Sequence, residues 1–162
     1  MKHYVGIDPG SKGAVAVLDK DGDIIYLKDL DKNIETYYNI YYDTVCNPDD
    51  CEQYVAVEDV CGRPGQSCAA NTTFMKLAGY AEFLGWMMQY SGDFIKVKPQ
   101  VWKKHFGLIF SKDVTKTEKK KASVMLARKL FPNNVEDFTL SKDGRAEAAL
   151  IARYLYDVQQ ET

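Results

Sequence analysis

No apolar stretch of this chain approaches the roughly 20 residues that a membrane-spanning helix needs, and the N-terminus carries no signal-peptide pattern. Internal repeats, low-complexity tracts and linker-like segments are also missing. With 46% apolar and 27% charged residues among 162, the composition is that of a globular chain long enough to bury a core. We therefore expect one domain over residues 1–162, in the cytoplasm and with no membrane partner.

Histidine is scarce, and the cysteines form no CxxC pair. Neither His3 nor His105 lies near a cysteine in the sequence, which disfavours a zinc site. We expect reduced thiols at all four cysteines, which are Cys46, Cys51, Cys61 and Cys68. The chain also shows no convincing pair of a nucleophile and a histidine, so we expect no covalent enzyme intermediate.

Positive charge is rare outside one segment. Residues 1–95 carry 7 Lys and Arg against 15 Asp and Glu, whereas residues 96–129 carry 11 basic side chains against two acids. The basic side chains are not interleaved with acids, so few helical ion pairs relieve their repulsion. A solvated helix face is the plainer interpretation. A polyanion would relieve the repulsion directly, and we expect this segment to contact nucleic acid.

Four acidic side chains occupy positions that suggest a metal site. Asp8 and Glu58 each end a short apolar run with the pattern of a buried strand. Asp143 and Glu147 lie four residues apart at the head of a C-terminal helix, which places both on one helix face. Clustered carboxylates repel each other unless divalent cations neutralise them, and such cations usually serve phosphoryl chemistry. The four acids therefore predict a metal-dependent site.

Three of the four acids also have a plain structural interpretation. Asp8 lies in an Asp-Pro-Gly string that is typical of a turn. The sequence is equally compatible with a turn-forming aspartate and with a functional one. Asp143 could be a helix N-cap, and Glu147 a first-turn acid that favours the helix dipole. Glu58 is favoured over Asp59 because neighbouring side chains of a strand point to opposite faces, so only one of the two can join the site.

Strand and helix signals alternate along the chain. The expected strands are residues 3–8, 13–19, 24–28, 54–58 and 94–97. The expected helices are residues 33–45, 71–88 with Asn71 or Thr72 as the cap, 99–106, 117–130 with Met125 facing inward, and 143–158. The first three strands form a meander, and the fourth is expected to be central and parallel to the first. The pattern predicts an α/β fold, a five-stranded mixed sheet with three antiparallel strands and then two parallel ones, flanked by helices.

Two further groups of residues could contact a substrate. The loop after Glu58 contains Arg63, Gln66 and Ser67, whose donors suit phosphate groups, although the loop could also be a mere connection. Trp102 and Phe106 lie among lysines and could stack on bases. Aromatic side chains on a helix are more often part of the core, and we favour that interpretation here.

Several strings resemble one family. The string VGIDPGSKG at residues 5–13 looks like the opening of the RuvC family of Holliday-junction resolvases, in the RNase H-like superfamily. The strings VEDV at residues 57–60, TFMKLAG at 73–79 and RAEAALIA at 145–152 resemble its later motifs, so that the resemblance extends over most of the chain. The strings GRPGQ and DGRAEA are most similar to the compact resolvases of bacteriophages and poxviruses.

The chain departs from the bacterial pattern at three places. In that pattern the last two acids lie three residues apart. Three residues before Glu147 this chain has Gly144, so the fourth acid would be Asp143, four residues before Glu147. The last acid is Glu147 where aspartate is usual. The aromatic wedge of the bacterial enzyme would fall near Cys61, so no cleavage-sequence preference is carried over.

The resemblance implies a nuclease that resolves four-way junctions and other branched DNA by paired nicks. Asp8, Glu58, Asp143 and Glu147 would be catalytic and would bind two Mg²⁺ ions about 4 Å apart, with Mn²⁺ as a substitute, to leave 5′-phosphate and 3′-hydroxyl ends. It also implies a homodimer, for which the helix around Gly79, Gly85, Met87 and Met88 is the expected interface. Together with the charge pattern it gives a set of expected DNA contacts, which are Lys12, Arg63, Gln66, Ser67, Lys98, Lys103, Lys104, Lys116, Lys119, Lys120 and Lys121.

Three alternatives stay open at this point. One is another RNase H-like nuclease that acts on RNA–DNA hybrids or as a transposase. A second is an ATPase of the actin and sugar-kinase group, whose phosphate loop has a similar string, but 162 residues are too few for its two domains. We therefore expect no nucleotide cofactor. The third is a module that binds junctions without cutting them, against which the four acids argue, because a pure polyanion binder would not keep them.

Overall fold

The computed structural model describes residues 1–45, 51–62 and 65–161. Its strands are β1 (Lys2–Asp8), β2 (Ala14–Leu18), β3 (Ile24–Asp29), β4 (Glu52–Glu58) and β5 (Ser91–Val97). Its α-helices are α1 (Ile34–Thr44), α2 (Cys68–Met88), α3 (Pro99–His105), α4 (Lys116–Leu130) and α5 (Asp143–Gln160), with short 3₁₀ turns at Pro132–Asp137 and Leu140–Lys142. This order of elements agrees with the order predicted from the sequence.

The five strands form one mixed sheet in the order β3-β2-β1-β4-β5. β2 pairs antiparallel with both β1 and β3, whereas β4 is parallel to β1 and β5 is parallel to β4. The two central strands, β1 and β4, are apolar in their middle because both of their faces are covered. The predicted meander followed by two parallel strands is therefore confirmed.

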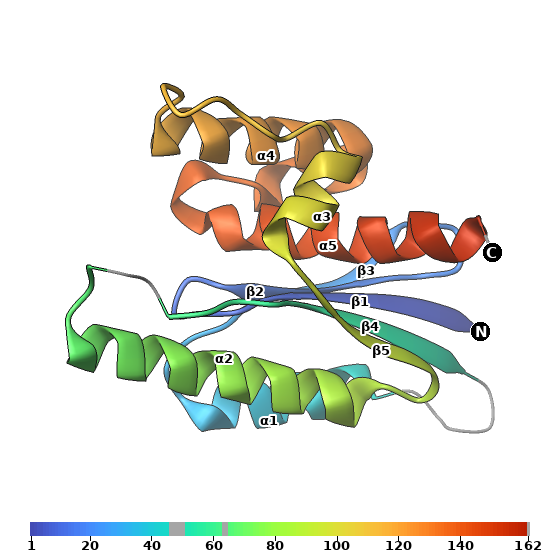
Figure 1. Cartoon of the computed structure of the whole chain (residues 1–162). Coiled ribbons are helices and arrows are strands. Elements are labelled where there is room, and N and C mark those ends of the chain that lie inside the picture. The colour runs from blue at the N-terminus through green and yellow to red at the C-terminus, as the bar shows by residue number, and fades with distance from the viewer. Residues whose placement is uncertain (46–50, 63–64, 162) are drawn as a thin grey trace.

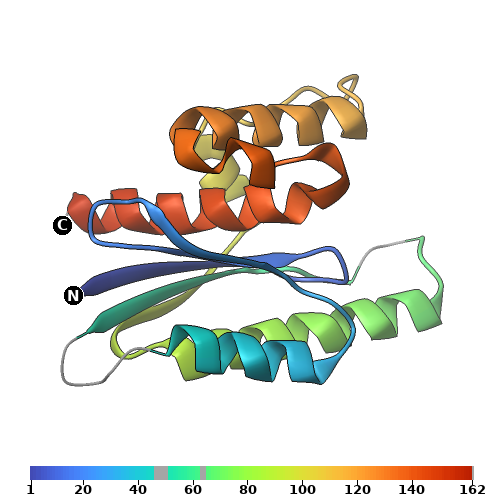
Figure 2. The same cartoon turned by 180° about the vertical axis from the view of Figure 1, so that it is seen from behind.

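Helices cover both faces of the sheet. In Figure 1, α1 and α2 lie below the sheet and α5 lies directly above it, with α3 and α4 stacked over α5. The reverse view in Figure 2 shows the same three layers. One core cluster lies between the sheet and the helices α1 and α2. A second lies between the sheet and α5 and includes buried residues of α3 and α4. Each face of the sheet thus has its own core.

Gly6 in the middle of β1 brings α5 close to the sheet. A Cβ atom at this position would collide with the backbone of Ala148 and Ala152 on α5. Because glycine has no side chain, the helix backbone can approach the strand directly. Gly6, two residues before Asp8, therefore fixes the position of α5 over β1.

The structure corrects two helix details and bears out a third. α2 begins at Cys68 and not at Asn71 or Thr72, because the Ser67 side chain accepts a hydrogen bond from the Ala70 N–H. α4 begins at Lys116, close to the predicted start at or near Thr117, and Thr115 and Glu118 form a capping box there. Met125 of α4, expected to face inward, has 60% of its surface exposed.

The cysteines differ in part from the prediction. Cys61 and Cys68 are free and exposed, as expected. Cys51 is disulfide-bonded, so the expectation of a reduced thiol is wrong at this position. Its Sγ also lies 3.5 Å from His3 Nδ1, a proximity of cysteine and histidine that their 48-residue separation concealed. No helix among the described residues is long and apolar enough to span a membrane.

Candidate active site

The four predicted acids line one cavity of about 870 Å³. Both chain termini lie at the right-hand end in Figure 1, so β1 ends and α5 begins at the opposite end of the sheet. Asp8 closes β1 and Glu58 closes β4, its parallel neighbour, so the two strands deliver these acids to the same edge. Asp143 and Glu147 reach it from the first turns of α5. Residues from opposite ends of the chain therefore meet in this cavity.

A tight turn after β1 shapes one wall of the cavity. Gly10 has a φ of +121°, which favours glycine, and its carbonyl accepts a hydrogen bond from Gly13 N–H at 3.1 Å. This turn leads directly into β2, which pairs antiparallel with β1. The Asp-Pro-Gly string is therefore a turn, as one interpretation had it, and it also places Asp8 at the cavity.

Glu58 is buried, with only 8% of its surface exposed. Its Oε1 accepts a hydrogen bond of 2.9 Å from the indole Nε1–H of Trp102 on α3. The neighbouring Asp59 borders the cavity too, but its carboxylate pairs with Lys96 of β5 at 3.5 Å. The two adjacent acids thus have different partners, although both border the cavity.

The start of α5 is set by Gly144. A Cβ atom at this position would collide with the carbonyl oxygen of Lys12, so no acid can stand there. The fourth acid therefore lies one residue earlier, at Asp143, which is the first residue of the helix. The N-cap is Lys142, without a capping side chain, so the alternative interpretation of Asp143 as an N-cap is wrong.

The cavity carries an excess of negative charge at its centre. The pKa of Asp8 is raised well above its ordinary value, first by burial and then by the charges of Glu147 and Glu58. The charge of Lys103 opposes this effect, and Asp143 adds to it. An ionised Asp8 is therefore costly unless further positive charge enters the cavity.

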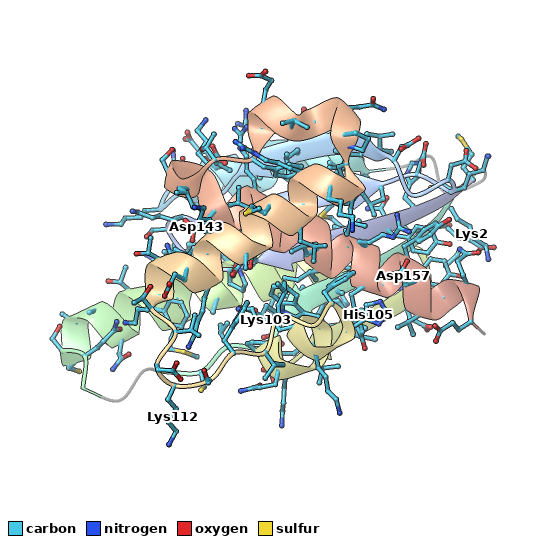
Figure 3. The ribbon with its side chains drawn as sticks, turned by 90° about the horizontal axis from the view of Figure 1, so that it is seen from above. Lys2, Lys103, His105, Lys112, Asp143 and Asp157 are labelled. Atoms are coloured by element: carbon cyan, nitrogen blue, oxygen red, sulfur yellow. The ribbon has the colours of Figure 1, made fainter. Side chains whose placement is uncertain are left out.

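Two lysine ammonium groups supply part of that charge. Lys120 Nζ lies 2.5 Å from Asp143 Oδ2, and Lys103 Nζ lies 3.5 Å from Glu147 Oε1. Figure 3 shows Lys103 on α3 and Asp143 at the start of α5. Among the described residues, no three His, Cys, Asp or Glu side chains are arranged closely enough to form a ready metal cage.

The donor set suits Mg²⁺ in kind, because all four acids offer the carboxylate oxygens that this ion takes as ligands. Burial and the negative charges of Glu147, Glu58 and Asp143 raise the pKa of Asp8, so a cation beside Asp8 would favour its ionised form. In the present arrangement, ammonium groups neutralise Asp143 and Glu147. Divalent cations would replace these ammonium groups as partners of the carboxylates.

The predicted DNA contacts divide into two groups. Lys12, Lys98, Lys103 and Lys120 line the cavity. The other lysines do not line it and form no ion pair with any described residue; they are Lys104, Lys116, Lys119 and Lys121.

The predicted loop contacts receive less support. Gln66 and Ser67 are exposed but do not line the cavity, and Ser67 caps α2. Arg63 lies outside the described residues.

Trp102 makes a contact to the site that the sequence did not predict. It was correctly assigned to the core, where it is fully buried. Its hydrogen bond to Glu58 was not foreseen, although a buried indole N–H needs an acceptor. Gln100 of α3, which does line the cavity, was not predicted either. The signal that the sequence offered was Pro99, a helix start close after the predicted strand at residues 94–97.

Another ionic group lies away from the cavity on the same layer. His105 Nε2 of α3 lies 2.9 Å from Asp157 Oδ2 of α5, and Figure 3 shows the two side by side. Asp157 also accepts a hydrogen bond from Arg153. This group joins α3 to α5 and so supports the helix that carries Trp102 and Lys103.

Comparison with solved structures identifies the fold. The structure of RuvC from Thermus thermophilus matches with a TM-score of 0.57 and 16% sequence identity, over 99% of this chain and 97% of that chain. No protein-family model and no curated protein sequence matches the chain. At this identity the likeness concerns the fold, a mixed sheet with the RNase H-like arrangement predicted from the sequence.

Proposed function

We propose that this chain is a divalent-metal-dependent endonuclease that nicks four-way junctions and other branched DNA. The observation that carries the proposal is the meeting of four carboxylates, from β1, β4 and α5, in one lysine-lined cavity. The fold shared with RuvC supports this choice over unrelated phosphoryl-transfer enzymes. Breadth of branched substrates and preference for a cleavage sequence are left to experiment.

Asp8, Glu58, Asp143 and Glu147 would bind the metal, as two Mg²⁺ ions or Mn²⁺ in their place. When bound, these ions supply stabilisation of negative charge on the reacting phosphate and lower the pKa of water. The carboxylates would orient the ions. Glu58 is buried and the other three acids are half-buried at the sheet edge, which limits competing solvent and strengthens the charge interactions in the cavity.

The lysines of the cavity would orient the DNA. Lys98 directly follows β5, the strand that is parallel to β4 with its terminal Glu58. We assign Lys98 to the backbone phosphate beside the scissile bond. Lys103 and Lys120 would exchange their carboxylate partners for phosphates once cations enter. Lys12, Lys104, Lys116, Lys119 and Lys121 would bind flanking phosphates without reading sequence.

Paired nicks require two active sites, so we propose a homodimer that forms through α2. The expected contacts at Gly85 and Met88 are wrong for an interface, because Gly85 packs against Val57 and Met88 is buried. The outward face of α2 instead presents Phe83 and Trp86, which are 61% and 63% exposed and stack on each other.

Gly79 lies one helical turn before Phe83 on α2. A Cβ atom there would meet open space, so another protein surface could approach the helix backbone closely at this point. Exposed apolar side chains beside such a site are typical of a helix that packs against another protein surface. A second copy of the chain, related by a two-fold axis, is the partner that we propose.

Two alternatives remain as outcomes of the test. A different RNase H-like nuclease would share the fold and the acids but would cut a hybrid or a linear duplex. A binding module would retain affinity for the junction without cutting it. We favour the resolvase because the sequence resemblance and the acid geometry coincide. Its resemblance to phage and poxvirus enzymes, and hence a bacterial host or viral replication compartment as its location, stay predictions.

The test uses a mobile four-way junction, a linear duplex and an RNA–DNA hybrid, each with Mg²⁺ or with EDTA. Paired nicks are expected in the junction alone, with ligatable 5′-phosphate ends. Asp8→Asn and Glu58→Gln should abolish cutting while junction binding persists. Cutting of the hybrid alone, or ATP hydrolysis, contradicts the proposal, and binding without cutting by the unaltered chain supports the binding module.

A further inference from the structure

Trp102 contacts two charged groups of the cavity at once. Its indole Nε1–H donates to Glu58 Oε1 at 2.9 Å, and the ammonium group of Lys103 lies 4.7 Å from the centre of its ring system. Lys103 also pairs with Glu147. Trp102 therefore connects the acid that ends β4 with an acid of α5, although it is itself fully buried and does not line the cavity.

The hydrogen bond to Glu58 limits how this carboxylate can turn. A buried carboxylate needs hydrogen-bond donors, and an indole N–H can only donate. The ring cannot move away, because Trp102 has no exposed surface and belongs to the core between the sheet and α5. A donor fixed in this way fixes Oε1 of Glu58 and with it the plane of the carboxylate.

The ring face acts on Lys103. An ammonium group over an indole is attracted by the negative π-face. This contact keeps the Lys103 ammonium group near the cavity, beside its half-buried partner Glu147. The same side chain thus orients one proposed metal ligand and restrains the ammonium group beside another.

We propose that Trp102 is a positioning residue that sets the cation affinity of the cavity by orienting the Glu58 carboxylate. This inference rests on the proposed role of Glu58 as a metal ligand. Hydrogen-bond partners of metal ligands typically change metal affinity by about 10–100-fold. We expect Trp102→Phe, which keeps most of the ring volume but lacks the N–H donor, to weaken Mn²⁺ binding by about 10-fold.

The first measurement observes the indole N–H directly by NMR. The chain has two tryptophans, and Trp86→Phe removes the exposed one, so the remaining indole signal belongs to Trp102. Its proton should resonate downfield, as hydrogen bonds to carboxylates do. Glu58→Gln should move the signal upfield, and Mg²⁺ should shift it in the unaltered Glu58 background. An indole signal that responds to neither change overturns the proposal, whatever the stability of the variants.

The second measurement is calorimetric titration of Mn²⁺ into the unaltered protein, Trp102→Phe and Trp86→Phe. Trp86→Phe is the matched control, because the same substitution at an exposed site should leave the affinity unchanged. Equal affinity in folded Trp102→Phe overturns the proposal, as does a complete absence of metal binding in the unaltered protein. If metal binds with the expected differences but no DNA is cut, the positioning role stands and only the nuclease proposal fails.

Discussion

Arg145 and Asp29 form a bidentate ion pair across 116 residues of sequence. Arg145 Nε donates to Asp29 Oδ1 at 2.6 Å, and Nη2 donates to Oδ2 at 2.9 Å. A third donor, Nη1, reaches Asp137. Arg145 lies on α5 between Asp143 and Glu147, so this pair connects the helix start to the end of β3. The rotation of α5 about its axis, which aims both acids, is thereby constrained.

Arg145→Lys should lower stability and loosen the site. Lysine offers a point charge in place of a planar fork, so it cannot form both hydrogen bonds to Asp29 in the same geometry. Asp29 is 42% exposed, so solvent screens the ion pair. The free energy of unfolding should therefore fall by only about 1 kcal/mol, which lowers Tm by about 2–4 °C. Thermal denaturation measures this, and Mn²⁺ titration should show weaker binding. Arg128→Lys, on α4 and outside the cavity, is the control that should leave Mn²⁺ affinity unchanged.

Asp8→Asn should stabilise the metal-free protein while it abolishes cutting. The raised pKa means that folded Asp8 keeps its proton to higher pH than the unfolded chain does. Wild-type stability should therefore fall as pH rises above the ordinary value of 3.8, whereas the asparagine variant has no such proton to lose. We expect Asp8→Asn to raise the free energy of unfolding of the metal-free protein by about 1 kcal/mol or more at pH 7. Near pH 3 the two proteins should be equally stable.

Denaturant unfolding at several pH values checks this behaviour. The exposed Asp93→Asn serves as the control and should show no such pH-dependent gain. Addition of Mg²⁺ should raise the stability of the wild type and have little effect on Asp8→Asn. A wild type whose stability advantage over Asp8→Asn grew with pH would show that the cluster is not short of positive charge.

Lys120→Ala should tighten cation binding yet slow DNA cleavage. Lys120 is 47% exposed and competes with cations for Asp143, so its removal should improve Mn²⁺ affinity by up to about fivefold, the equivalent of an exposed ion pair of ~1 kcal/mol. Cleavage at saturating Mg²⁺ should fall because a phosphate contact is lost. Lys121→Ala, outside the cavity, is the control for the titration. Weaker cation binding by Lys120→Ala would contradict the competition.

Phe83→Lys should disrupt the proposed homodimer and leave a monomer. A charge placed in the exposed aromatic stack of α2 cannot be desolvated cheaply at an interface. Light scattering during size-exclusion chromatography measures the mass, and sedimentation confirms the state. Ile25→Lys on the edge strand β3 is the matched control, because Ile25 is also exposed but lies away from α2. A monomeric unaltered chain, or a dimer that tolerates Phe83→Lys, would exclude this interface.

Much of the fold could be predicted because its signals are local. Apolar runs such as residues 54–57 and the turn at Asp21-Gly22 mark the strands, and helical spacing marks the helices. Errors occurred where a cap decided the boundary. α2 begins at Cys68, before the predicted Asn71 or Thr72 cap, because the Ser67 hydroxyl caps it. The inward assignment of Met125 failed because only one stripe of α4 packs on the core.

The sequence by itself determined the alternating pattern of an α/β sheet, the basic segment and the position of four acids at element ends. Only the tertiary structure decided how these acids are partnered. The Trp102 hydrogen bond, the lysine pairs and the exclusion of a side chain at Gly144 depend on backbones that approach within a few ångströms from distant parts of the chain. Periodicity reports the burial of a residue, whereas the identity of its neighbour follows from how helices and sheet pack in three dimensions.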